Sequence, residues 1–112
     1  NMDTDSIIHT VIVENLRRRL GRDYREVVVS PDGDPDITLG NHGLVLAVVE
    51  VETEASISNE KAEKWRRMAH AGTKLILMIP RSARSRVTEV LWQEGIADKV
   101  SLGTYEIVIN MP

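Results

Sequence analysis

Three carboxylates lie at the ends of two apolar segments and could together bind a divalent metal. Asp36, preceded by a proline, opens the short apolar segment 36–39, and Glu50 and Glu52 close the long apolar segment 44–53. Side chains alternate between the two faces of a strand, so Glu50 and Glu52 would share one face. Carboxylates brought together repel one another unless a cation neutralises them, and Mg²⁺ or Mn²⁺ prefers such oxygen ligands. The alternative for a lone Glu-x-Glu is a solvent-facing strand end that pairs with arginines.

The turn between these segments favours close approach of Asp36 and Glu50. Residue 43 lies midway between them, inside the glycine-bounded stretch 40–43. If the two segments pair as an antiparallel hairpin, the carboxylates come side by side with at most a bulge or a small register shift. The sequence therefore predicts a metal site whose ligands are Asp36 and Glu50.

These residues resemble the motif of the PD-(D/E)XK nuclease superfamily, in which Pro-Asp is followed, after a variable gap, by an acidic residue, any residue and lysine. Pro35-Asp36 and Glu50-Val51-Glu52 match this motif, except that Glu52 stands where the lysine is usual. The resemblance extends over nearly the whole chain in the order of predicted elements. It implies a restriction endonuclease-like fold, similar to that of Holliday junction resolvases. It also implies hydrolysis of nucleic-acid phosphodiester bonds with Mg²⁺ or Mn²⁺, with DNA preferred over RNA as the partner.

The same resemblance implies catalytic roles for Glu52 and for two lysines. Some members of the superfamily carry a glutamate at the lysine position, and others place the lysine on the following helix, where Lys61 and Lys64 stand here. A lysine in such a site positions the attacking water and stabilises the charge that develops on the phosphoryl group. The alternative for Lys64 is a helix-surface ion pair with Glu60.

Glu14 lies on the first predicted helix, where related nucleases carry a glutamate close to the metal. The resemblance therefore implies a supporting catalytic role for it. The alternative, given equal weight, is a surface ion pair with Arg17 or Arg18, which follow at helical spacing.

Arginine dominates the basic residues and forms several clusters, one of which suits phosphate binding. Arg81, Arg84 and Arg86 follow a predicted strand and enter a helix, where backbone amides and guanidinium groups could hold a nucleic-acid phosphate. The alternative is that this segment merely caps the helix and binds no phosphate. The formal net charge of −3 argues against indiscriminate binding to polyanions.

The periodicity predicts an α/β fold in which a mixed sheet is flanked by helices. Helices are expected over 3–20, 58–70 and 84–93, the first capped by Thr4, Asp5 or Ser6 and the second by Ser58 or Asn59. Strands are expected over 24–29, 36–39, 44–53, 74–79 and 99–109, the last as one or two strands with a break at Gly103. The resulting order is α-β-β-β-α-β-α-β. The Glu50 end of the central third strand should open into a cleft lined by the first two helices.

Length and composition set the remaining expectations. The 112 residues predict one domain over 1–112, and 42% apolar with 28% charged residues excludes a disordered chain. No segment approaches the roughly 18 apolar residues of a membrane span, so we expect no membrane partner and a cytoplasmic location. A homodimer is expected because one small domain offers little surface for gripping a duplex.

Other chemistries find no support in the sequence. His42 and His70 lack a second histidine at metal-ligand spacing, the serines lack a nucleophile motif, and no glycine-rich phosphate loop is present. Trp65 and Trp92 are expected in the core or at an interface. The rival to a nuclease is a non-catalytic module on the same fold that binds nucleic acid or protein.

Overall fold

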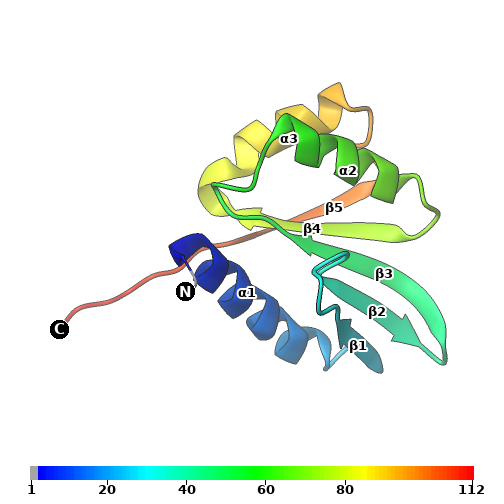
Figure 1. The fold of residues 1–112 in the computed structure, drawn as a ribbon, viewed down its shortest axis with the longest axis horizontal. Coiled ribbons are helices and arrows are strands. Elements are labelled where there is room, and N and C mark those ends of the chain that lie inside the picture. The colour runs from blue at the N-terminus through cyan, green and yellow to red at the C-terminus, as the bar shows by residue number, and fades with distance from the viewer. Residues whose placement is uncertain (1–2) are drawn as a thin grey trace.

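The computed structural model describes residues 3–112, and its centre is a five-stranded mixed sheet (Figure 1). The strands lie in the order β1-β2-β3-β4-β5, with β1–β2 and β2–β3 antiparallel and β3–β4 and β4–β5 parallel. Their bounds are Glu26–Val29, Ile37–Asn41, Leu44–Val51, Lys74–Pro80 and Val100–Tyr105. The prediction of an α/β fold with a mixed sheet is confirmed, and β3 is its central strand.

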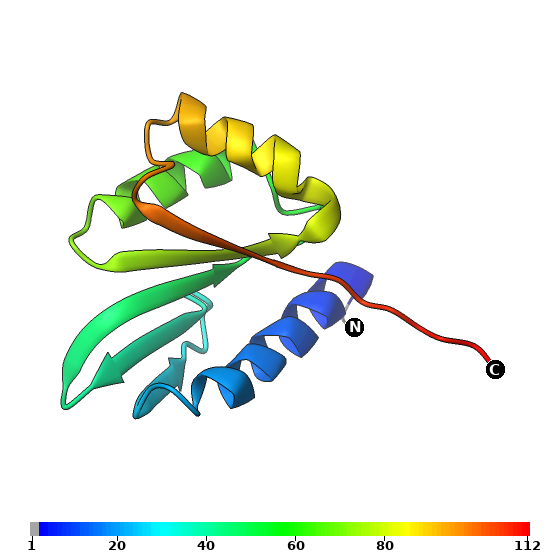
Figure 2. The same cartoon turned by 180° about the vertical axis from the view of Figure 1, so that it is seen from behind.

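Three α-helices cover the two faces of this sheet. They are α1 (Thr4–Leu20), α2 (Asn59–Ala69) and α3 (Arg84–Gln93), the last preceded by the 3₁₀ helix η1 (Arg81–Ala83). Helix α1 lies on one face, and α2 and α3 lie on the other (Figures 1 and 2). Asp3, one residue before the expected caps, accepts a hydrogen bond from Ser6 N and begins α1. Ser58 caps α2 as predicted. Within residues 3–112, no helix is long and apolar enough to cross a membrane.

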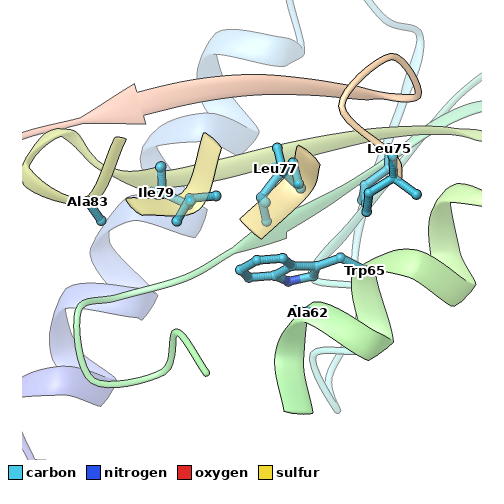
Figure 3. Close-up of a cluster of buried hydrophobic side chains, with 9 residues drawn as sticks. Ala62, Trp65, Leu75, Leu77, Ile79 and Ala83 are labelled. Atoms are coloured by element: carbon cyan, nitrogen blue, oxygen red, sulfur yellow. The ribbon is translucent and has the colours of Figure 1, made fainter. Parts of the chain in front are cut away.

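Each face of the sheet carries its own hydrophobic core. On the side of α2 and α3, Trp65 packs completely buried against β4 residues Leu75, Leu77 and Ile79 (Figure 3). On the side of α1, the core is built from Ile12, Val13, Ile37, Leu39, Ala47, Val49 and Val51. Trp65 is therefore a core residue as expected. Trp92, in contrast, is 72% exposed on α3.

The β2–β3 hairpin sets the register that the site depends on. His42 and Gly43 form its turn with φ angles of 51° and 79°, the left-handed conformation that two-residue hairpin turns require. Ile37 pairs with Val49, and the register shifts once, between Leu39 and Gly40. The predicted hairpin with a small register shift is confirmed.

The last strand differs from its prediction. Strand β5 runs without interruption through Gly103, where an added Cβ would lie 2.5 Å from Met78 Sδ, so glycine makes room for Met78 rather than ending the strand. The strand ends at Tyr105, which pairs with Pro80, the last residue of β4. Residues 106–112 continue beyond the sheet (Figure 2).

Candidate functional site

A cleft of about 310 Å³ opens at the carboxyl end of β3. Its walls come from α1, from the loop before β2, from the end of β3 with the segment that follows, and from α2. The residues that carry its chemistry are Asp5, Ser6, His9, Asp36, Glu50, Glu52, Thr53, Ser56, Lys61 and Lys64. The predicted cleft at the Glu50 end, between the first two helices, is confirmed.

Asp36 is fixed at the mouth of the hairpin by two contacts. Its Oδ2 accepts a hydrogen bond from the Val51 N–H at 2.8 Å, and its Oδ1 lies 2.9 Å from His9 Nε2 on α1. Gly33 has a φ of +71°, and a Cβ there would lie 3.2 Å from Asp36 Oδ1. The preceding loop therefore needs glycine both for its own conformation and for this close approach.

Glu50 lies beside Asp36, with only 2% of its side chain exposed. Its Oε1 accepts a hydrogen bond from the Asp36 N–H at 3.2 Å, and its Oε2 lies 3.3 Å from Lys64 Nζ. Burial, followed by repulsion from Asp36, raises the pKa of Glu50 to about 7, although Lys64 opposes the shift. At neutral pH this carboxyl therefore holds a proton part of the time and would release it to a cation.

His9 joins the site, although no sequence motif singled it out. The hydrogen bond with Asp36 raises the pKa of His9, against the opposing effect of partial burial. A signal did exist in the helical spacing. His9 lies four residues before Val13 and seven before Leu16, both of which pack into the core under α1. A polar residue on the inward face of an amphipathic helix is a candidate for a site contact.

Glu52 is completely buried and anchors Lys61. Its Oε1 accepts from Lys61 Nζ at 2.9 Å and from Ser56 Oγ at 2.7 Å, and its Oε2 accepts from Trp65 Nε1 at 2.9 Å. The Glu52 carbonyl also accepts a hydrogen bond from Tyr105 Oη. Every oxygen of this residue thus has a donor, so its charge is compensated inside the protein.

Both predicted lysines reach the cleft from α2. The side chains of Lys61 and Lys64 are 37% and 24% exposed, so each can still meet a ligand. Lys64 Nζ lies 3.2 Å from Asp34 Oδ1 and 3.3 Å from Glu50 Oε2. Burial lowers the pKa of Lys64, but Glu50 and Asp34 outweigh it and the net shift is upward. Lys64 therefore carries its positive charge within the cleft.

Thr53 supplies a second group that the sequence did not single out. It is 3% exposed, lines the cleft, and its Oγ1 has no hydrogen-bond partner among residues 3–112. A buried hydroxyl without a partner is rare in a folded protein. Because this oxygen is shielded from solvent, a ligand in the cleft could reach it only if neighbouring side chains moved.

The structure places four other predicted residues away from this cleft. Glu14 is half exposed and pairs with Arg17, whose hydrogen bond lowers the Glu14 pKa. It lines a neighbouring depression of about 360 Å³, which His9 and Asp36 also border. The three arginines at η1 and α3 are exposed: Arg81 lies 3.2 Å from Glu106, Arg86 lies 3.1 Å from Glu54, and Arg84 begins α3.

The donors in the cleft suit a hard cation that needs few protein ligands. Within residues 3–112, no group of three or more Asp, Glu or His side chains is arranged to hold a metal. Mg²⁺, however, is commonly bound by one or two carboxylates, with waters and substrate phosphates completing the shell. Asp36 and Glu50 are two such carboxylates at this cleft, although each of their oxygens already lies beside a protein donor. These two residues are the ones that would hold Mg²⁺ or Mn²⁺ in that sparse mode.

Comparison with protein-family models, with curated proteins and with solved structures gives no match for this chain. The geometry of the cleft therefore carries the functional argument.

Proposed function

We propose that this chain is a metal-dependent nuclease of the PD-(D/E)XK type, which hydrolyses phosphodiester bonds in DNA in preference to RNA. The observation that carries the proposal is one cleft that combines two adjacent buried carboxylates, Asp36 and Glu50, with two lysines from α2. The mixed sheet with helices on both faces is compatible with the restriction endonuclease-like fold that this proposal includes.

The acidic pair would hold the metal. Asp36 and Glu50 would bind Mg²⁺ or Mn²⁺, which when bound stabilises phosphoryl charge and activates water. Burial and then repulsion from Asp36 raise the pKa of Glu50, and a cation bound here would relieve the repulsion, which supports this assignment. His9 holds Asp36 Oδ1 in place from α1.

The lysines would supply the positive charge that the usual motif lysine provides. Glu52 occupies that position in the sequence, and Lys61 is held at its carboxylate. We therefore assign Glu52 as the positioning residue and Lys61 as the cation that contacts the phosphate. Lys64, beside Glu50, would contact the same phosphate from the next turn of α2.

A supporting electrostatic contact is assigned to the N-terminal region of α3. Arg84 is exposed there, while Arg81 and Arg86 would have to exchange Glu106 and Glu54 for nucleic-acid phosphates. We expect Arg84 to contribute most of the three to nucleic-acid binding, because Arg81 and Arg86 would first have to break their ion pairs with glutamates. Glu14, paired with Arg17, would stay outside the reaction unless a bound duplex separates that pair.

One observation favours a second candidate, a non-catalytic binding module. Both cleft lysines already lie against carboxylates, Lys61 against Glu52 and Lys64 against Glu50. In that case the cleft would bind a phosphate group without cleaving it.

A cleavage assay separates the two candidates. Labelled duplex, branched and single-stranded DNA and RNA are incubated with Mg²⁺ or Mn²⁺, using wild type, Glu50→Gln and Lys61→Met. We expect metal-dependent cleavage that is lost in Glu50→Gln and falls by about 10²–10³-fold in Lys61→Met. Glu89→Gln and Lys99→Met are the matched controls, because both residues are exposed outside the cleft. Retained DNA binding with no cleavage of any substrate would favour the binding module.

A further inference from the structure

Lys64 lies between two carboxylates that differ sharply in exposure. Its Nζ lies 3.3 Å from Glu50 Oε2 and 3.2 Å from Asp34 Oδ1. The Glu50 side chain is 2% exposed, whereas the Asp34 side chain is 66% exposed. Glu50 therefore holds the Lys64 ammonium from the protein interior, and Asp34 contacts the same ammonium from the side that is open to solvent.

The contact between Lys64 and Asp34 can be exchanged at little cost. An ion pair with an exposed partner contributes little to stability, because water screens it and the side chains lose freedom. The loop that carries Asp34 has its own hydrogen bonds, from Gly33 N–H to the Ser30 carbonyl at 3.1 Å and from Asp34 N–H to Asp32 Oδ1 at 3.2 Å. Lys64 keeps its contact with Glu50 when Asp34 leaves.

The other lysine of the cleft, Lys61, has no such exchangeable partner. Its carboxylate partner, Glu52, is completely buried and also accepts hydrogen bonds from Ser56 Oγ and Trp65 Nε1. A phosphate that arrives from solvent can contact the Lys61 ammonium without replacing that carboxylate. At Lys64, a phosphate would approach from the side that Asp34 occupies, where two anions repel each other.

We propose that Asp34 is a built-in competitor for the substrate phosphate: its carboxylate occupies the open side of Lys64 in the free protein, and the phosphate displaces it. Such a competitor lowers the affinity for any phosphate at Lys64, so a ligand needs further contacts in the cleft to bind well. The proposal rests on phosphate binding in this cleft, which the nuclease and the binding module both require, and not on cleavage.

DNA affinity without metal tests the competition. Fluorescence anisotropy in EDTA would compare labelled duplex DNA bound to wild type, Asp34→Asn and Glu60→Gln. Glu60 is the matched control, because it is exposed one helical turn before Lys64 and forms no ion pair among residues 3–112. Asp34→Asn should bind about two- to fivefold more tightly than wild type, and Glu60→Gln should gain clearly less.

Three results of this comparison would overturn the proposal. Equal gains in Asp34→Asn and Glu60→Gln would show only a general effect of charge. Weaker binding by Asp34→Asn would show that Asp34 positions Lys64 for the ligand, and no DNA binding by any of the proteins would leave nothing to compete with. Binding in the expected order, without metal-dependent cleavage of any substrate, would support the competition and count against the nuclease assignment alone.

A double-mutant cycle tests whether the competition acts through Lys64. The gain from Asp34→Asn should disappear when Lys64→Met is already present, because the ammonium for which the two anions compete is gone. Circular dichroism would check that the single and double variants are folded. A gain of the same size in the Lys64→Met background would contradict the proposal.

Nuclear magnetic resonance follows the displacement in the wild-type protein, without any substitution. A ¹⁵N-labelled sample is titrated with inorganic phosphate and then with the same DNA. The amide signal of Asp34, whose N–H is bonded to Asp32 in the same loop, should shift as the cleft fills. The signal of Asp98, exposed outside the cleft, should stay in place. An Asp34 signal that does not move when DNA saturates the protein would overturn the displacement.

Discussion

At the scale of single residues, the pair Asp36 and Glu50 decides how the site responds to protons and cations. The Asp36 backbone N–H donates to Glu50 Oε1, so the hairpin ties the Glu50 side chain to the backbone of Asp36. Burial, followed by repulsion from Asp36, raises the pKa of Glu50 to about 7. A metal bound at the proposed site would therefore compete with the proton for this carboxyl.

The raised pKa predicts that the metal-free protein loses stability as pH rises. A carboxyl whose folded pKa rises from 4.5 to about 7 stabilises the fold below pH 4.5, and this contribution is lost on the way to pH 7. The loss is at most on the order of 3 kcal/mol. The raised pKa of His9 acts in the same direction, because its contribution is lost as pH rises past 6.5. Thermal unfolding in EDTA should show this decline.

Glu50→Gln should flatten the part of the decline that lies between pH 4.5 and 7. The control is Glu54→Gln, since Ser82 and Arg86 lower the pKa of that exposed carboxyl instead. A stability profile that is identical in wild type and Glu50→Gln would contradict the assignment.

Mg²⁺ or Mn²⁺ should stabilise the protein, and more at pH 8 than at pH 6, because the metal must displace a proton from Glu50. At a hundred times the dissociation constant the gain is about 2.7 kcal/mol. Differential scanning fluorimetry would measure it. Asp36→Asn should abolish the thermal shift, and Glu54→Gln should keep it. Equal shifts in the wild type and both variants would contradict the assignment of a metal site to Asp36 and Glu50.

At the scale of elements, Glu52 joins the end of β3 to α2. Its carboxylate accepts from Trp65 Nε1 and Ser56 Oγ and pairs with Lys61. A lysine at this position, as in the nuclease motif that the sequence resembles, would leave the Trp65 and Ser56 donors without their acceptor. It would also place a second buried cation beside Lys61. The donors that converge on position 52 therefore favour glutamate over lysine there.

Glu52→Lys should therefore destabilise the protein by about 3–5 kcal/mol, the cost of a buried charge without a partner. Urea denaturation would measure the change. Adding Lys61→Glu should recover part of the loss by reversing the pair, whereas Glu54→Lys, at an exposed position, should change stability by less than about 1 kcal/mol. Unchanged stability in Glu52→Lys would show that the network contributes little.

At the scale of the whole molecule, charge limits how nucleic acid can be held. The formal net charge is −3, and several arginines are paired with acids on the surface. Affinity for DNA depends on the number of phosphates that cations neutralise. A molecule with this balance should rely on a few local contacts, from Lys61, Lys64 and Arg84.

The salt dependence of DNA binding tests this view. Fluorescence anisotropy with the Glu50→Gln variant should give a slope of log K against log salt no steeper than about −4, corresponding to at most four phosphate contacts. Arg84→Ala should make the slope shallower by about one, and Arg22→Ala, on the exposed loop after α1, should leave it unchanged. A steeper slope, or one insensitive to Arg84, would place the DNA elsewhere.

Local sequence alone predicted the mixed sheet, most element positions and the meeting of Asp36 with Glu50. These features follow from short-range rules, namely alternation along a strand and helical periodicity. The turn at His42 and Gly43 also determines which residues of β2 and β3 pair with each other. The end of β5 was predicted less well. The β-branched residues 107–109 favour a strand, but β4 ends at Pro80 and leaves them no partner within the sheet.

Only the tertiary structure decided which side chains from the helices enter the cleft. His9 rather than Glu14 contacts Asp36, Lys61 contacts the buried Glu52, and the Thr53 hydroxyl has no hydrogen-bond partner in the described part of the chain, 3–112. Each of these outcomes depends on how α1 and α2 are rotated and shifted against the sheet. That placement is set by packing of Val13 and Trp65 into two separate cores, through contacts between residues distant in sequence, which periodicity does not encode.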